Sequence, residues 1–370
     1  MIYLDYQATT PLAPEVAAVM RPWVEEKFAN PHSPSTWGRE AAAAIEFARG
    51  RIETAIGLEG GRFAFTGSAT EALNWAIKGT FESSLRRKLV TIATEHAAVL
   101  DTADWLEGRG IEVVRLGVGS DGLIDLARAQ ESVDENTALV AAMLVNNEIG
   151  VIQPVAELVW LAHDRGALML CDAVQGFGRM DIPDGPDLLA ISGHKIHGPK
   201  GIGGLWIRAG AEPEPLLHGG GQEQGLRSGT LSPALCVGLG EAARLAAERR
   251  DADAAHVAKL HELALITLGQ GWIINGHAEH RYPGNLNLRR DGLNGARMIS
   301  DLRNIALSIG SACASGSGRP SHVLRAIGLS DREARSSIRL GFGRYTGEEE
   351  LASACRRIDE AARAQAVLPT

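Results

Sequence analysis

One cysteine of this chain lies among small and polar residues. In the stretch SIGSACASGSGRPSHVL, Cys313 is surrounded by Gly, Ser and Ala, which are typical of solvent-exposed loops. Buried structural thiols usually have apolar neighbours, so this thiol is suited to act as a nucleophile. From this stretch alone, an unused cysteine in a surface loop is an equal alternative.

Two further groups lie where strands are expected to end. In LLAISGHKIHGPKGIGG, Lys195 follows an apolar run and has Ser192 and His194 as neighbours. Asp172 ends the buried run ALMLCD, where a carboxylate needs a cation or several donors. A protonated pyridine ring would be such a cation, and the carboxylate would make it an electron sink. A solvated lysine and a capping aspartate are the ordinary alternatives.

A phosphate site is indicated after another expected strand. FAFT runs into GSATEALNWAIKG, where Ala69 allows close backbone approach and Thr70 offers a hydroxyl at a helix start. A plain helix cap explains the same residues. A Walker-type phosphate loop is excluded around Lys195, because GHKIHGPKG lacks the spacing G-x-x-x-x-G-K-[ST].

Three more side chains suit a planar cofactor. His96 in ATEHAAVL can stack on a ring or move protons near neutral pH, although a structural histidine is the usual case. Asn147 in MLVNNEIG and Gln175, three residues after Asp172, are amides that could contact a ring hydroxyl or a substrate.

The elements that must position these groups alternate between short β-rich runs and helical segments from about residue 38 to 250. This order predicts an α/β fold with a mainly parallel seven-stranded sheet. Its expected strands are RFAFTG, KLVTIAT, IEVVRLG, TALVAAMLV, ALMLCD, LLAIS and GGLWIR. The last two are joined by a loop too short for a crossover helix, so we expect them to pair antiparallel.

A smaller α+β unit is expected after the alanine-rich helix near 232–249 and its continuation. NLNLRR, IALSIG and SSIRLGFG are its candidate strands, with helices around 294–303 and from about 347. We assign residues 15–250 to a large domain, and residues 1–14 with 251–370 to a small domain that carries the Cys313 loop. The first dozen residues are too few to fold independently and should pack against one of these units.

Composition limits the class of protein. The 370 residues carry 45% apolar side chains and a net charge of −8, which argues against nucleic acid as a partner. The four cysteines form no C-x-x-C pair, so neither a metal site nor a disulfide framework is indicated, and a reducing compartment fits best. No secretory leader and no apolar run of membrane-spanning length is visible, so we expect a cytoplasmic protein without membrane contact.

Taken together, these segments resemble the cysteine desulfurases, pyridoxal 5′-phosphate (PLP) enzymes of fold type I in the class V aminotransferase group. The resemblance covers nearly the whole chain. Its motifs, in the family's order, are YLDYQATTP, ATEALNWAIKG, TEHAAVLDT, VNNEIGVIQP, DAVQGFG, ISGHKIHGPKGIGG, LHGGGQEQGLRSGT, GSACASGS and SSIRLGFGR.

The resemblance implies a role for each candidate. Lys195 would carry PLP covalently, Asp172 would pair with the ring nitrogen, and His96 would stack on the ring. The phosphate would be held by Ala69, Thr70, Ser192 and His194, and by Thr230 from a second subunit. Gln175 and Asn147 would reach the ring hydroxyl, Arg339 would bind the substrate carboxylate, and Asn30 would lie near the substrate.

The implied reaction converts L-cysteine to L-alanine, with the sulfur held as a persulfide on Cys313 and passed to an acceptor such as an iron–sulfur scaffold protein. The cysteine loop has the long form of the branch that serves iron–sulfur assembly, but Gly318-Arg319 stands where an apolar-acidic pair is usual. Selenocysteine lyase or another class V activity is the alternative enzyme. A PLP-fold binding module is the non-enzymatic alternative.

Overall fold

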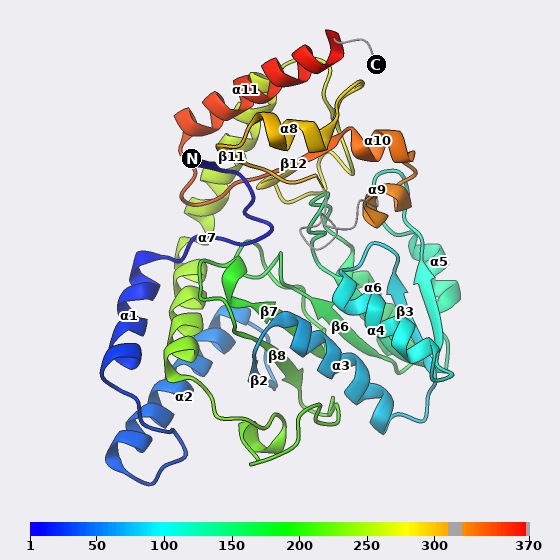
Figure 1. The fold of residues 1–370 in the computed structure, drawn as a ribbon. Coiled ribbons are helices and arrows are strands. Elements are labelled where there is room, and N and C mark those ends of the chain that lie inside the picture. The colour runs from blue at the N-terminus through cyan, green and yellow to red at the C-terminus, as the bar shows by residue number, and fades with distance from the viewer. Residues whose placement is uncertain (310–319, 368–370) are drawn as a thin grey trace.

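The computed structural model describes residues 1–309 and 320–367 (Figure 1). Its largest sheet has seven strands in the order β2-β8-β7-β6-β5-β3-β4. The strands are β2 (Gly61–Thr66), β3 (Lys88–Ile92), β4 (Glu112–Leu116), β5 (Thr137–Met143), β6 (Leu168–Asp172), β7 (Leu188–Ser192) and β8 (Gly203–Arg208). β8 runs in the opposite direction to the other six strands of this sheet. The seven predicted strands and the antiparallel pairing of β7 with β8 are confirmed.

Both faces of this sheet are covered by helices. Every residue of β5 is buried. Its side chains alternate between two hydrophobic clusters: Val140 and Ala142 belong to the first cluster, and Leu139 and Ala141 belong to the second. Apolar residues of α2, α6 and α7 join the first cluster, and those of α3 and α4 join the second. The helices of this part are α1 (Pro14–Glu25), α2 (Thr36–Ile56), α3 (Ala69–Ser83), α4 (Ala97–Glu107), α5 (Leu126–Ser132), α6 (Val155–Asp164) and α7 (Pro233–Leu268).

The packing of α2 against α7 depends on small residues. Buried positions of α2 recur every three or four residues, at Ala41, Ile45, Ala48 and Ile52, which is the period of one helix face. A Cβ at Gly240 of α7 would lie 2.7 Å from the Cα of Ala48, so glycine is needed for the two helices to approach this closely.

The remaining elements form a smaller α+β region. A three-stranded antiparallel sheet has the order β12-β10-β9, and β1 pairs in parallel with β11. The strands are β1 (Ile2–Tyr3), β9 (Ile273–Ile274), β10 (Asn285–Arg289), β11 (Ile305–Ala306) and β12 (Ser337–Gly341), and the helices are α8 (Gly295–Asp301), α9 (His322–Ala326), α10 (Asp331–Arg335) and α11 (Glu348–Val367). The first residues of the chain therefore pack against this region through β1.

Helix α7 connects the two regions. It contacts α1 and α2 beside the large sheet and α11 in the smaller region (Figure 1). The domain boundary that we place at residue 250 falls inside this continuous helix and stays a prediction. Among residues 1–309 and 320–367, no helix has the length and apolar character needed to cross a membrane.

Candidate active site

Most of the predicted site residues line one cavity of about 260 Å³ at the carboxyl ends of the parallel strands. The predicted residues in its wall are Ala69, Thr70, His96, Asn147, Asp172, Gln175, Ser192, His194, Lys195 and Arg339. Arg339 comes from the middle of β12 in the smaller region. Each of the others ends or follows a strand of the large sheet, so this sheet brings together side chains that are far apart in sequence.

The N-terminus of α3 forms one end of the cavity. The Ser68 hydroxyl accepts a hydrogen bond from the Glu71 N–H at 3.2 Å, which leaves the first N–H groups of the helix, at Ala69 and Thr70, at the cavity. Gly203 of β8 permits this position, because a Cβ there would lie 2.8 Å from the Ala69 nitrogen. A helix N-terminus with free N–H groups favours an anion such as phosphate.

His194 and Ser192 lie next to this helix end. The Nδ1 atom of His194 lies 3.1 Å from the Thr9 hydroxyl. Burial and the positive charges of Lys195, Lys200 and Arg179 lower the pKa of His194 to about 4, so the ring is neutral at neutral pH. Ser192 is buried at the end of β7. Both side chains can therefore serve as uncharged hydrogen-bonding groups at an anion.

Asp172 ends β6 as a buried acid. Its Oδ1 accepts from the Val174 N–H at 2.9 Å. Burial raises the pKa of Asp172, while the Val174 N–H and the neighbouring His96 and Lys195 act in the opposite direction. A cation in the cavity would stabilise the ionised form further. His96 precedes α4 and caps it: its Nδ1 accepts from the Ala98 N–H at 3.1 Å, so the proton of the neutral ring is on Nε2.

Lys195 ends a short turn after β7, and its ammonium faces backbone oxygens. Its Nζ donates to the carbonyls of Gln7 at 2.5 Å and Ala8 at 2.8 Å. Burial, followed by the charges of Arg179 and Arg339, lowers the pKa of Lys195 to about 7. A large share of the molecules therefore carries a neutral amine at neutral pH, as a nucleophile or a general base requires.

Arg339 is 1% exposed and lies on β12. Its Nη1 donates to the Asn147 carbonyl at 2.9 Å and its Nη2 to Asp5 Oδ1 at 2.6 Å. The Nε atom is buried without a hydrogen-bond partner among the described residues. The guanidinium is thus fixed at the cavity by Asp5, a residue that the sequence did not identify.

Sequence reasoning also missed the Gln7 and Ala8 carbonyls and Arg179. The motif YLDYQATTP marked the first segment, but a backbone oxygen leaves no signal in a sequence. Arg179 follows Gln175 by four residues in a turn, and its Nη1 donates to Gln175 Oε1 at 2.6 Å. Nothing in the stretch GFGRM distinguishes this arginine from one at the surface.

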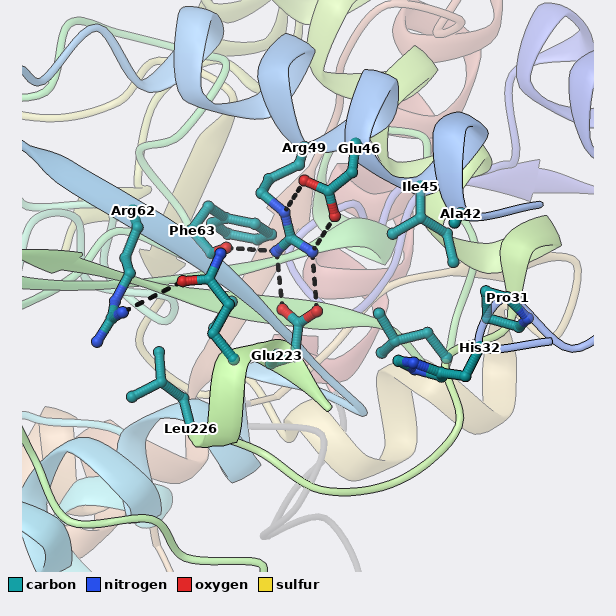
Figure 2. Close-up of a pocket in the computed structure, with 13 residues that line it drawn as sticks. Pro31, His32, Ala42, Ile45, Glu46, Arg49, Arg62, Phe63, Glu223 and Leu226 are labelled. Carbon is teal, nitrogen blue, oxygen red and sulfur yellow. Dashed lines mark hydrogen bonds and ion pairs between the residues drawn. The ribbon is translucent and has the colours of Figure 1, made fainter. Parts of the chain in front are cut away.

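Asn30 and Thr230 do not line this cavity. Both are exposed, and each is next in sequence to residues of a separate pocket of about 240 Å³. Figure 2 shows that pocket, where Glu46 and Glu223 bracket the Arg49 guanidinium. Cys313 lies outside the described residues.

The residues of the first cavity fit PLP. The buried carboxylate of Asp172 matches a protonated ring nitrogen, and Lys195 has the lowered pKa of an amine that bonds a carbonyl carbon. The start of α3 matches a phosphate. One cavity therefore offers partners for the three polar ends of this cofactor.

Comparison with known proteins agrees with this arrangement. Residues 2–353 match the aminotransferase class-V family. The chain is 44% identical over 368 residues to a cysteine desulfurase IscS of Rickettsia bellii, covering 96% of this chain and 90% of that protein. It is 42% identical to the IscS of Rickettsia prowazekii, and the match covers 98% of this chain and 92% of that protein.

Solved structures show the same similarity. A protein described as NifS-like superposes with a TM-score of 0.90 at 34% identity, covering 98% of this chain and 99% of that chain. SspA in complex with cysteine gives a TM-score of 0.83 at 36% identity, covering 94% and 100%. With the family match and the IscS relatives, these similarities establish that the chain belongs to the class V aminotransferase family and, within it, to the PLP-dependent cysteine desulfurases.

Proposed function

We propose that the protein converts L-cysteine to L-alanine and holds the sulfur as a persulfide on Cys313. The observation that supports this most directly is the single cavity in which Lys195, Asp172 and Arg339 meet. The IscS relatives are named cysteine desulfurases, and one similar solved structure is described as a complex with cysteine.

The cavity residues have separate roles in proton transfer and in binding charged groups. Bound PLP supplies an electron sink that stabilises negative charge at the substrate Cα. Asp172 keeps the proton on the ring nitrogen, and Arg339 binds the substrate carboxylate through paired N–H donors. Lys195 takes the proton from the substrate Cα, and its pKa of about 7 makes the amine available near neutral pH.

The sulfur step belongs to Cys313. Its thiolate attacks the substrate sulfur, so that an S–S bond forms as the Cβ–S bond breaks. His96 transfers protons to or from the substrate during these steps. The thiol and L-cysteine together contain all the atoms of the persulfide and L-alanine, so the step needs no external oxidant. A sulfur acceptor then takes the outer sulfur atom.

A homodimer with shared active sites is part of the proposal. Thr230 is exposed on the loop that follows Glu223. Glu223 fixes this loop to its own subunit. Its carboxylate accepts two hydrogen bonds from Arg49 (Figure 2) and one from the Phe65 N–H. The loop is therefore anchored at one end, and Thr230 is exposed on it. In the proposed dimer this residue contacts the PLP phosphate of the second subunit. Asn30 would lie near the substrate in the same dimer.

Iron–sulfur cluster assembly is the proposed use of the sulfur, with a scaffold protein as acceptor. It is supported by the long cysteine loop and by the IscS relatives. A cytoplasmic, reducing setting is proposed because Cys171, Cys236 and Cys355 are buried free thiols. Selenocysteine lyase is the alternative activity, since it can proceed without a persulfide-forming cysteine.

The test is turnover of L-cysteine by the purified protein with PLP. We expect equal amounts of alanine and sulfide in the presence of a thiol reductant, and loss of both in Lys195→Ala. Cys313→Ala should still bind PLP and show its visible absorbance, yet form no alanine from L-cysteine. Retained turnover in Cys313→Ala would favour the alternative activity, and a chain that stays colourless with added PLP would contradict the proposal.

A further inference from the structure

Arg179 is a cationic side chain at the active site to which the mechanism assigns no role. It lies seven residues after Asp172, in the turn that follows β6, and lines a small second cavity behind Lys195. Within the part of the chain that the structure describes, no acidic side chain forms an ion pair with it. Asp253, which lines the same small cavity, already accepts two hydrogen bonds from Arg344.

The hydrogen bonds of Arg179 all go to active-site residues. Its Nη1 donates to the backbone carbonyl of Gln175 at 3.1 Å and to the side-chain Oε1 of Gln175 at 2.6 Å. Its Nη2 donates to the backbone carbonyl of Lys195 at 3.0 Å. The guanidinium also lies over the Tyr282 ring, 5.0 Å from its centre. One side chain thus connects Gln175 and Lys195 from outside the cofactor cavity.

These contacts determine which end of the Gln175 amide can face PLP. A guanidinium has only donors, so Oε1 of Gln175 must point to Arg179. The Nε2 group then donates one hydrogen to the Gln7 carbonyl at 3.0 Å, and its second N–H is left for the cofactor cavity that Gln175 lines. A donor at this position suits a negatively charged ring oxygen, whereas the reversed amide would repel it.

We propose that Arg179 is a positioning residue: it orients the Gln175 amide so that an N–H faces the cofactor, and it fixes the backbone of Lys195. This inference rests on the proposed function, because the acceptor is the ring oxygen of PLP. Arg179 has a second effect through space. Its charge is the largest cause, after burial, of the lowered pKa of Lys195. The other charged groups that act on Lys195 are Arg339, which also lowers its pKa, and Asp5 and Asp172, which raise it.

The first test measures Lys195 in the full chain freed of PLP. Competitive acetylation across pH, quantified by mass spectrometry, should give a pKa of about 7 in the wild type and about 8 in Arg179→Met, because one nearby positive charge is gone. Arg179→Lys should return the value toward the wild type. Arg250→Met is the matched control, since Arg250 lines the same small cavity but pairs with Asp181. An unchanged pKa in Arg179→Met would refute the through-space effect.

The second test asks whether Arg179 acts through Gln175. Arg179→Met should weaken PLP binding about tenfold in the wild-type background, but only about threefold in a Gln175→Ala background, where no amide remains to be oriented and only the effect on Lys195 is left. Equal losses in both backgrounds would overturn the positioning role. If the wild-type chain bound no PLP, the proposed function would fail instead. Circular dichroism and the melting temperature of each variant control for folding.

Discussion

Replacement of Lys195 by methionine should stabilise the PLP-free protein by an amount that falls as pH rises. The pKa of Lys195 is lowered from 10.5 to about 7 in the folded chain, so the unfolded chain binds more protons between these values. Stability contributed by this site therefore increases with pH through that window and is lowest at acid pH. The difference of about 3.5 in pKa corresponds to a destabilisation of about 5 kcal/mol below pH 7.

The destabilisation by Lys195 should be about 4 kcal/mol at pH 7 and about 2 kcal/mol at pH 9. Lys195→Met removes it, so the advantage of the variant in the free energy of unfolding should shrink by about 2 kcal/mol between the two pH values. The lost packing is the same at both pH values and cancels in this difference. The bonds from Lys195 to the Gln7 and Ala8 carbonyls are stronger for the ammonium form, and their effect is already contained in the pKa of Lys195.

Urea unfolding of the PLP-free full chain, at one protein concentration, measures this change. Lys200→Met is the control, because Lys200 is nearby but exposed and its replacement should give no pH-dependent difference. An advantage of Lys195→Met that is equal at pH 7 and pH 9 would refute the reasoning, since it would mean that Lys195 has an ordinary pKa in the folded chain.

Two further predictions concern the supports of the site. Gly203→Ala should cost about 1 to 3 kcal/mol of stability and weaken PLP binding, because the added Cβ meets the backbone at the start of α3. The control is Gly50→Ala, whose Cβ meets open space and which should not reduce stability. Equal melting temperatures for the two variants would contradict this prediction. Glu223→Gln should cost about 3 kcal/mol in urea unfolding, because it leaves a buried Arg49 with a weakened partner. Its control, Glu46→Gln, removes the charge of the 65% exposed partner of the same arginine and should cost under about 1 kcal/mol. Similar losses in the free energy of unfolding would show that the buried pair contributes no more than the exposed one.

The large sheet could be predicted from the sequence because its strands are short apolar runs separated by helical segments. β5 is buried on both faces, so its sequence is apolar throughout and needs no alternation to be recognised. The length of α7 was harder to predict. Its part before residue 250 is rich in alanine, and the expected continuation extends to Leu268. That continuation mixes charged and apolar residues, so no definite end could be predicted for it.

Part of the active site could also be anticipated. Lys195 and Asp172 follow neighbouring strands, and the carboxyl ends of parallel strands meet at one edge of a sheet. Asn30 and Thr230 show the limit of this reasoning. Their motifs match the family, but both lie outside the cavity of this chain, so the roles that the resemblance implies for them depend on the proposed second subunit.

Local residue patterns were sufficient to predict the strand order along the chain, the family and the side chains at the strand ends. The surroundings of these side chains depend on contacts between segments that are distant in sequence. Pairing of β1 with β11 brings the first residues beside β12, so that Asp5 meets Arg339 and the Gln7 carbonyl meets Lys195. The turn after β6 aims Arg179 at Gln175. These contacts join residues through folded geometry, and burial there sets the pKa of Lys195 in a way that no residue pattern expresses.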